Sequence, residues 1–264
     1  MMHSRFRIAS RLALALAVSS LVVPTAGVAE TGLEKQSRKA FEEMKQRIPI
    51  STHEHATQIV ECVTYGLIAV IDSSEAQKNW EVVLFDDQDI NAFALAGGKV
   101  GVNTGIFKVA DNPDALAAVI GHEIAHVMEK HVAKRRTRQT LTQVGAVAAA
   151  IGAGVAGAPG VTQQAAANAA SLGAELGINK PYDRAQETDA DIVGMHYMAR
   201  AGFDPRATVD LWKNMAKANR GSPPEFLSTH PSSDNRLARL AEELPSAIKE
   251  YEAAKTAGRS PDCN

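Results

Sequence analysis

The stretch VIGHEIAHVMEKH, residues 119–131, places three histidines and two glutamates in an otherwise apolar part of the chain. It contains the H-E-x-x-H pattern of metal-binding helices. Residues four apart lie one turn from each other on the same face of a helix, so His122 and His126 can bind one zinc ion. Glu123 lies beside them and can act as a base toward water. A chance match in a chain of this length is on the order of one per cent, so we predict a zinc site.

The segment around this motif has the strongest helix signals in the chain. Residues 111–136, DNPDALAAVIGHEIAHVMEKHVAKRR, begin with Asp111 or Asn112 as N-cap and end in cations that suit a helix C-terminus. In such a helix His131 follows His122 by nine residues and lies on roughly the opposite side. We therefore expect a structural or surface role for His131, and no part in metal binding.

A catalytic zinc ion needs a third protein ligand and an open coordination position. The metzincin extension of the motif requires Gly at 129 and His at 132, whereas this chain has Glu129 and Val132. The third ligand must come from elsewhere, and RAQETDADIVG, residues 184–194, is the candidate. On a helix Glu187 and Asp191 share a face, so one can bind zinc while the other accepts a hydrogen bond from a ligand imidazole.

Helices dominate the rest of the chain. We predict two helices in residues 30–72, with Ser51 or Thr52 capping the second, and later helices near 184–200, 205–219 and 233–255. Residues 80–87 and 90–107 contain β-branched and aromatic runs with a Gly97-Gly98 turn, which predicts a small antiparallel sheet. The expected fold class is α+β, mostly α-helical.

The first 29 residues have the composition of a secretory signal peptide. Three arginines precede the apolar run of residues 12–23, and small residues lead to a cleavage site after Ala29. The apolar run falls short of the roughly 20 residues of a spanning helix, so we expect cleavage and export. Cleavage removes three arginines and changes the formal net charge from −2 to −5, which argues against nucleic-acid binding.

Two cysteines, Cys62 and Cys263, remain after cleavage. Paired cysteines are the rule in oxidising compartments, and closing this long loop would stabilise the fold by roughly 3 to 5 kcal/mol. We predict a disulfide between the C-terminal tail and the second helix, with two unpaired thiols as the alternative.

The Ala- and Gly-rich residues 141–160 are long enough to suggest a membrane span. Alanine and glycine offer little transfer free energy compared with leucine or phenylalanine. We expect no transmembrane span in the mature chain, and instead a loosely packed helical element that could cover the site.

Four motifs in one order carry a family resemblance: INAFALAGGKVGVNTG, HEIAH, RAQETDAD..G and STHPSSDNR. Together they resemble the HtpX/BepA-like zinc metalloendopeptidases, which are related to CAAX prenyl proteases (family forty-eight of the metallopeptidases). The resemblance spans about residues 55–245. It implies a zincin-like (gluzincin) fold, a single metallopeptidase domain of residues 30–264 and one zinc ion per chain.

The resemblance also implies residue roles. His122, His126 and Glu187 match the zinc ligands, and Glu123 matches the catalytic base. Asp191 matches an aspartate behind the ligands, Arg236 a site arginine, and His230 a histidine that stabilises the transition state. Asn91, Ala92, Phe93 and Ala94 match an edge strand that pairs with the substrate backbone. The chain departs from the family at Asp183, where a small hydroxyl residue is common.

The activity implied is endopeptidase cleavage of unfolded or misassembled cell-envelope proteins in the bacterial periplasm. The chain lacks the flanking membrane helices of HtpX-like members and the tetratricopeptide repeats of BepA-like ones. Substrates and partners therefore carry over least, and peripheral membrane association stays open. One alternative is a chaperone-like, zinc-bearing binding protein, whose signature would be a fourth protein ligand; none is evident in the sequence. Another is a partner of outer-membrane protein assembly with latent protease activity.

Overall fold

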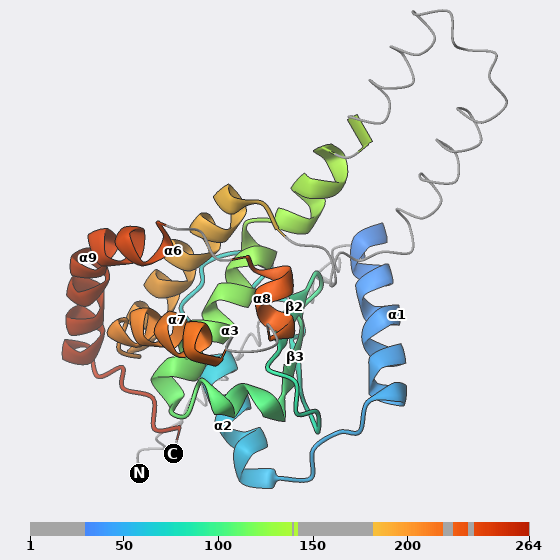
Figure 1. Cartoon of the computed structure of the whole chain (residues 1–264), viewed down its shortest axis with the longest axis horizontal. Coiled ribbons are helices and arrows are strands. Elements are labelled where there is room, and N and C mark those ends of the chain that lie inside the picture. Colours follow the sequence, from blue (N-terminus) through green and yellow to red (C-terminus); the bar gives the residue numbers. More distant parts are fainter. Residues whose placement is uncertain (1–29, 139, 142–181, 219–223, 232–234, 264) are drawn as a thin grey trace, which may run out of the picture.

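The computed structural model describes residues 30–138, 140–141, 182–218, 224–231 and 235–263. The predicted signal peptide and residues 142–160 of the Ala- and Gly-rich segment lie outside these residues. Figure 1 shows the helices gathered around α3, with a small sheet between α3 and α1. In chain order the elements are α1 Gly32–Arg47, α2 Glu54–Ile68, β1 Glu81–Phe85, β2 Ala92–Leu95, β3 Lys99–Asn103, the 3-10 helix η1 Thr104–Lys108, α3 Pro113–Met128, α6 Arg184–Ala201, α7 Arg206–Ala218, α8 Glu225–Thr229 and α9 Arg236–Thr256.

The predicted fold class, mostly helical with one small sheet, is confirmed. The sheet itself is mixed, where we expected an antiparallel one. Its strand order is β1-β3-β2, with β3 antiparallel to β2 and parallel to β1. The glycine turn joins β2 to β3 as predicted, because Gly97 and Gly98 both adopt positive φ. Strand β3 then inserts between β1 and β2, so β2 stands at one edge of the sheet.

The two faces of the sheet pack against different partners, as the alternation of side chains along a strand requires. On one face Phe93 and Leu95 join Val83 and Phe85 around Phe41 of α1 in a small apolar cluster. On the other face, alternate residues of the same strands belong to the main core with α2 and α3. The sheet is therefore held between α1 and α3 (Figure 1).

Helix α3 lies at the centre of the fold and begins where its sequence predicts. The Oδ1 atom of Asn112 accepts a hydrogen bond from Ala115 N at 2.9 Å, so Asn112 is the N-cap. Every residue from Ala115 to His126 is buried. Polar side chains buried on such a helix need polar partners, because an unpaired buried polar group destabilises the fold. We therefore expect the histidines of α3 and Glu123 to have such partners.

A glycine contact brings α3 and α6 close together. A Cβ atom added to Gly194 of α6 would lie 2.7 Å from backbone atoms of Gly121 and His122. The two helix backbones can therefore approach this closely only because neither glycine has a side chain. Since Gly121 directly precedes His122, the contact also sets how far α6 stands from the predicted ligands.

The long helix predicted for residues 111–136 is broken. Helix α3 ends at Met128, and Lys130 has φ +54° before a second helical run begins at His131. Positive φ lies outside the helical region and changes the direction of the chain. A side chain beyond this point therefore has a different orientation from the one that a continuous helix would give it.

Two further details of the fold differ from the prediction. The N-cap of α2 is His53, with no hydrogen bond from its side chain, while Ser51 Oγ accepts from His53 N at 3.2 Å. Between the helices predicted near 205–219 and 233–255 the chain forms a further short helix, α8, which ends directly before His230.

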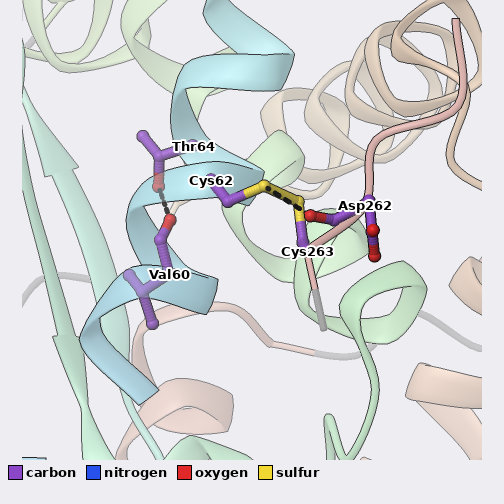
Figure 2. Close-up of a disulfide and its surroundings, with 5 residues drawn as sticks. All are labelled: Val60, Cys62, Thr64, Asp262 and Cys263. Atoms are coloured by element: carbon purple, nitrogen blue, oxygen red, sulfur yellow. Dashed lines mark hydrogen bonds between the residues drawn. A yellow bond between two sulfur atoms is a disulfide. The ribbon is translucent and has the colours of Figure 1, made fainter. Parts of the chain in front are cut away.

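The structure contains the predicted disulfide between Cys62 of α2 and Cys263 in the C-terminal tail (Figure 2). The tail follows α9 and packs its Pro261 and Arg259 near Gly66 and Gly202. The bridge therefore holds the end of the chain against α2 and α6. No helix among the described residues has both the length and the apolar character to cross a membrane.

Candidate metal centre

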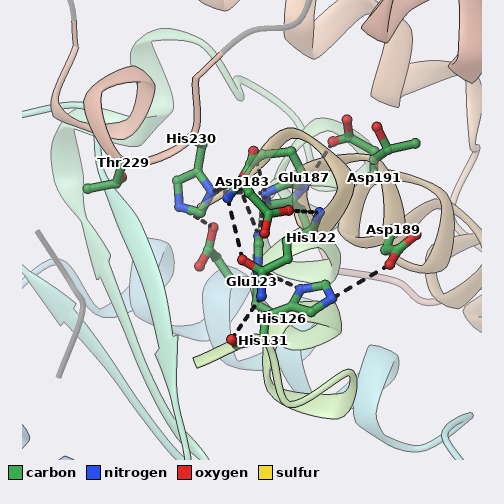
Figure 3. Close-up of polar contacts among 12 residues, drawn as sticks. His122, Glu123, His126, His131, Asp183, Glu187, Asp189, Asp191, Thr229 and His230 are labelled. Carbon is green, nitrogen blue, oxygen red and sulfur yellow. Dashed lines mark hydrogen bonds and ion pairs between the residues drawn. The ribbon is translucent and has the colours of Figure 1, made fainter. Parts of the chain in front are cut away.

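Helix α3 presents His122, Glu123 and His126 toward one point (Figure 3). All three side chains are buried, with exposed fractions of 3%, 3% and 1%. The Nε2 atoms of His122 and His126 are 3.1 Å apart, as expected for imidazoles one helical turn from each other. The spacing in the sequence thus places two nitrogen donors side by side in the interior.

Helix α6 and the residue after α8 complete the group. Glu187, in the first turn of α6, places its carboxylate oxygens 3.7 Å from His122 Nε2 and 3.5 Å from His126 Nε2. The Nδ1 atom of His230 lies 3.1 Å from His122 Nε2 and 3.1 Å from a Glu187 oxygen. One donor atom from each of the four residues lies within 4.8 Å of all the others. Three imidazoles and a carboxylate in this arrangement fit a divalent metal ion.

His230 adds a fourth potential donor, where none was evident in the sequence. The sequence offered no spacing argument, because His230 lies on a segment that is far from α3 in the chain. Helix α8 carries it back: His230 N donates to Phe226 O at 2.8 Å, and the two rings stack with centroids 4.4 Å apart. The imidazole is therefore fixed with Nδ1 toward the other donors.

Asp191 and Arg236 form a buried layer behind the group. Asp191 Oδ1 accepts a hydrogen bond from His122 Nδ1 at 2.9 Å, and Arg236 Nε donates to its other oxygen at 2.6 Å. Arg236 also donates to Glu187 at 2.5 Å, and its guanidinium lies 3.7 Å from the centroid of the Trp212 ring. Although burial acts to lower it, the pKa of His122 is raised by the hydrogen bond and charge of Asp191. One arginine thus joins two carboxylates on the same face of α6.

The two glutamates of the site have pKa values shifted in opposite directions. Burial raises the pKa of Glu123 above its usual range. Burial acts in the same direction on Glu187, but the His230 hydrogen bond and the charge of Arg236 lower its pKa overall. Burial also lowers the pKa of His126 well below its usual range, which favours the neutral form that binds metals. Glu187 is therefore suited to be a charged ligand, and Glu123 to exchange a proton.

A cavity runs along β2 beside the group. It is lined by residues 91–95, Glu123, Val132, Tyr182, Thr229 and His230. The backbone N–H of Ala94 acts to lower the pKa of Glu123, which places this part of the strand close to the carboxylate of α3. The predicted strand residues Asn91 to Ala94 thus lie at a sheet edge beside Glu123, on the wall of the cavity.

Two further residues, Tyr182 and His131, lie beside the group although no pattern in the sequence placed them there. Tyr182 stacks on the His126 ring with centroids 3.8 Å apart and an interplanar angle of 27°. His131, for which we expected a structural or surface role, is fully buried beside His126 and is not one of the four donors. Neither residue is related to the H-E-x-x-H motif by helical spacing. The break after α3 places His131 beside His126, and Tyr182 is placed there because it directly precedes the N-cap of α6.

Comparison with known proteins agrees with this geometry. The model of peptidase family M48 matches residues 54–244 of the chain. The chain belongs to peptidase family M48. The match begins at α2 and ends within α9, so it includes β2, the histidine motif, Glu187, His230 and Arg236.

This M48 chain is similar to proteins of two names, mitochondrial metalloendopeptidase OMA1 and beta-barrel assembly-enhancing protease. It is 34% identical over 202 residues to the mitochondrial metalloendopeptidase OMA1 of Schizosaccharomyces pombe, covering 75% of this chain and 56% of the relative. It is 31% identical over 208 residues to the beta-barrel assembly-enhancing protease of Yersinia pestis, covering 74% and 40%. The corresponding Escherichia coli protein is 32% identical over 179 residues, covering 66% and 36%. The M48 chain thus spans about half or less of these relatives.

Proposed function

We propose that residues 30–264 form one zinc-dependent endopeptidase domain that hydrolyses peptide bonds in unfolded or misassembled proteins. The proposal is carried by one observation: a buried group of histidines and Glu187 lies directly beside the Glu123 carboxylate and a cavity lined by the edge strand β2. Membership of peptidase family M48 and the names of the relatives support it.

The donor set suits zinc. Zn–N bonds of about 2.0–2.1 Å in a tetrahedral site separate neighbouring donor atoms by roughly 3.3 Å. Among His122, His126 and Glu187 the donor separations run from 3.1 to 3.7 Å. His122, His126 and Glu187 would hold the ion, with Asp191 and Arg236 orienting them. When bound, zinc supplies a Lewis acid for the peptide carbonyl and lowers the pKa of a coordinated water to about 7.

Glu123 is the proposed general base. Its Oε1 atom is buried without a hydrogen-bond partner among the described residues, and it faces His230 Nε2 at 3.3 Å. The raised pKa of this carboxyl brings it closer to the working pH, where a group can both accept and return a proton. Glu123 would take a proton from the attacking water and deliver it to the leaving amine.

The edge of β2 offers a way to bind substrates of many sequences. Asn103 N donates to Asn91 O, so Asn91, Phe93 and Leu95 face β3 in the antiparallel ladder. The backbone groups of Ala92 and Ala94 consequently point away from β3, toward Glu123 and the cavity. An extended peptide paired with this edge would be recognised by its main chain, which favours unfolded substrates.

His230 has two possible parts in this function. As a fourth donor it would occupy the coordination position that a catalytic site keeps open. In the proposed reaction its imidazole leaves the group and donates a hydrogen bond to the oxyanion, an interaction worth a few kcal/mol in transition-state stabilisation. The four-donor arrangement would then be a resting form of the site.

The same arrangement supports a second candidate function. A zinc ion closed by four protein ligands is typical of structural sites. A zinc-bearing binding protein that holds unfolded envelope proteins would have this site permanently closed by His230. A partner of outer-membrane protein assembly with latent protease activity would have it closed until His230 is released. The second candidate function is supported by the relatives whose names refer to beta-barrel assembly.

Hydrolysis of casein by the mature, oxidised, zinc-loaded protein tests the proposal. Glu123→Gln with equal zinc content is the matched control, since the amide keeps the shape but cannot accept the proton. We expect cleavage that the variant lacks; cleavage by neither protein would favour the binding function. His230→Ala then tells the two roles apart, because a lower turnover fits oxyanion stabilisation and a higher turnover fits a closing ligand.

The site of action is proposed to be the bacterial periplasm. The basic, apolar and small-residue segments of residues 1–29 support export, and the Cys62–Cys263 bridge is typical of oxidising compartments. Mass spectrometry of the exported protein should give an N-terminus at Glu30. An intact N-terminus would refute cleavage after Ala29.

A further inference from the structure

His131 contacts the outer nitrogen of a proposed metal ligand. Its Nδ1 atom lies 3.0 Å from Nδ1 of His126, on the side of that ring away from the donor group (Figure 3). We infer that His131 is a positioning residue for His126: its Nδ1 atom accepts the His126 Nδ1 proton and so holds His126 Nε2 toward the metal. The inference rests on the proposed zinc site.

The direction of this hydrogen bond follows from the geometry. His126 Nε2 is the atom that faces the other donors, 3.1 Å from His122 Nε2, so this nitrogen must carry the lone pair that binds a metal. The proton of the neutral His126 ring then resides on Nδ1. Since two protonated nitrogens cannot share a hydrogen bond, His131 Nδ1 must be the acceptor, and the His131 proton resides on Nε2.

The surroundings of His131 agree with this assignment. Its Nε2 atom is buried, has no hydrogen-bond partner among the described residues, and lies 3.9 Å from a carboxylate oxygen of Asp189. A proton on Nε2 directs a positive partial charge toward that carboxylate. The opposite tautomer would direct a lone pair at Asp189 and leave His126 without an acceptor.

The fold fixes the backbone of His131 from two sides. On one side, Lys130 has φ +54° and changes the direction of the chain after α3. On the other side, the His131 carbonyl accepts a hydrogen bond from Gln186 Nε2 at 2.9 Å. Gln186 also belongs to the capping box at the start of α6, directly before Glu187. The imidazole is therefore held by the same turn of α6 that presents the carboxylate ligand.

The two ligand histidines of α3 consequently have different outer partners. His122 donates to the carboxylate of Asp191, whereas His126 donates to the neutral ring of His131. Partners of this kind fix the tautomer and orientation of ligand imidazoles, and their loss typically weakens metal binding about 10- to 100-fold. A neutral acceptor orients His126 without adding a fourth buried carboxylate to Glu123, Glu187 and Asp191.

Two variants separate positioning from packing. His131→Leu fills a similar volume without an acceptor, and His131→Asn places an amide oxygen near the position of Nδ1. Zinc affinity is measured by competition with a chelator, and thermal unfolding of the zinc-free proteins reports the fold. We expect His131→Leu to bind zinc about 10- to 100-fold more weakly than the wild type, with His131→Asn close to the wild type.

Equal affinities of all three proteins, or equal losses in both variants, would overturn the inference. The wild type serves as a separate check, because its failure to bind zinc would refute the proposed function instead. Should His131→Leu not fold, ¹H–¹⁵N correlation spectra of the histidine rings in the zinc-loaded wild type decide the matter. A proton on His131 Nε2 supports the inference, and a proton on His131 Nδ1 refutes it.

Discussion

Replacing Gly194 by alanine should separate α6 from α3 and weaken the metal site. The new Cβ would lie 2.7 Å from backbone atoms of Gly121 and His122, whereas ordinary contact begins at 3.4 Å. The helices must therefore move apart by about 0.7 Å, the difference between these distances. Metal–ligand distances tolerate only about 0.2 Å. Since Glu187 and His122 lie on opposite sides of this contact, we expect zinc affinity to fall at least about tenfold.

The effect on stability needs a control, because alanine also favours the helix by about 1 kcal/mol relative to glycine. Gly66→Ala in α2 provides it: its Cβ would meet the Phe203 ring at 3.5 Å and Pro261 Cγ at 4.0 Å, both ordinary contacts. Both variants gain helix propensity, and only Gly194→Ala pays for overpacking, which costs about 1 to 3 kcal/mol. We therefore expect Gly194→Ala to unfold with a free energy about 1 to 3 kcal/mol below that of Gly66→Ala.

Urea unfolding of the zinc-free proteins measures this difference, and chelator competition measures zinc affinity. If Gly194→Ala matches Gly66→Ala in stability and the wild type in zinc affinity, the close contact of α3 and α6 does not set the ligand geometry.

Three further predictions concern parts of the fold that support the site. Asp191→Asn should weaken zinc binding about 10- to 100-fold; an unchanged affinity would remove Asp191 from the layer behind the ligands. Cys62→Ala combined with Cys263→Ala should lower the free energy of unfolding by about 3 to 5 kcal/mol, measured by urea unfolding against the oxidised wild type. Lys78→Met should lower it by about 1 kcal/mol at neutral pH, because Lys78 pairs with the largely buried Glu34. Although burial opposes it, the Lys78 hydrogen bond lowers the Glu34 pKa below 4.5, so this advantage is present above pH 4.5 and disappears as pH falls through the folded-state pKa. Stability curves of wild type and Lys78→Met that stay parallel under acid would contradict it.

The break after α3 explains why the sequence did not place His131 beside His126. On a continuous helix, His131 would point away from His122, and that argument placed it outside the site. Lys130 leaves the helical region at φ +54°, so the following residues start a new helical run in another direction. Lysine carries no signal for such a turn, which glycine or asparagine would have given. The break depends on contacts such as the Gln186 hydrogen bond to the His131 carbonyl.

The mixed sheet has a similar cause. The turn at Gly97 and Gly98 is local, so the β2–β3 hairpin could be predicted from residues next to one another. Strand β1 has no comparable signal for its neighbour. It lies parallel to β3, with alternate side chains divided between Phe41 of α1 and the main core.

The sequence by itself determined whatever depends on spacing within one helix or turn. It placed His122, Glu123 and His126 on one stretch of α3, and Glu187 and Asp191 on one face of α6, because helical periodicity is a local property. Only the tertiary structure decided which segments meet: His230 enters the donor group, His131 lies behind His126, and β2 becomes the edge beside Glu123. These contacts join residues far apart in the chain, and they depend on close packing such as that of Gly121 on Gly194, which no local pattern encodes.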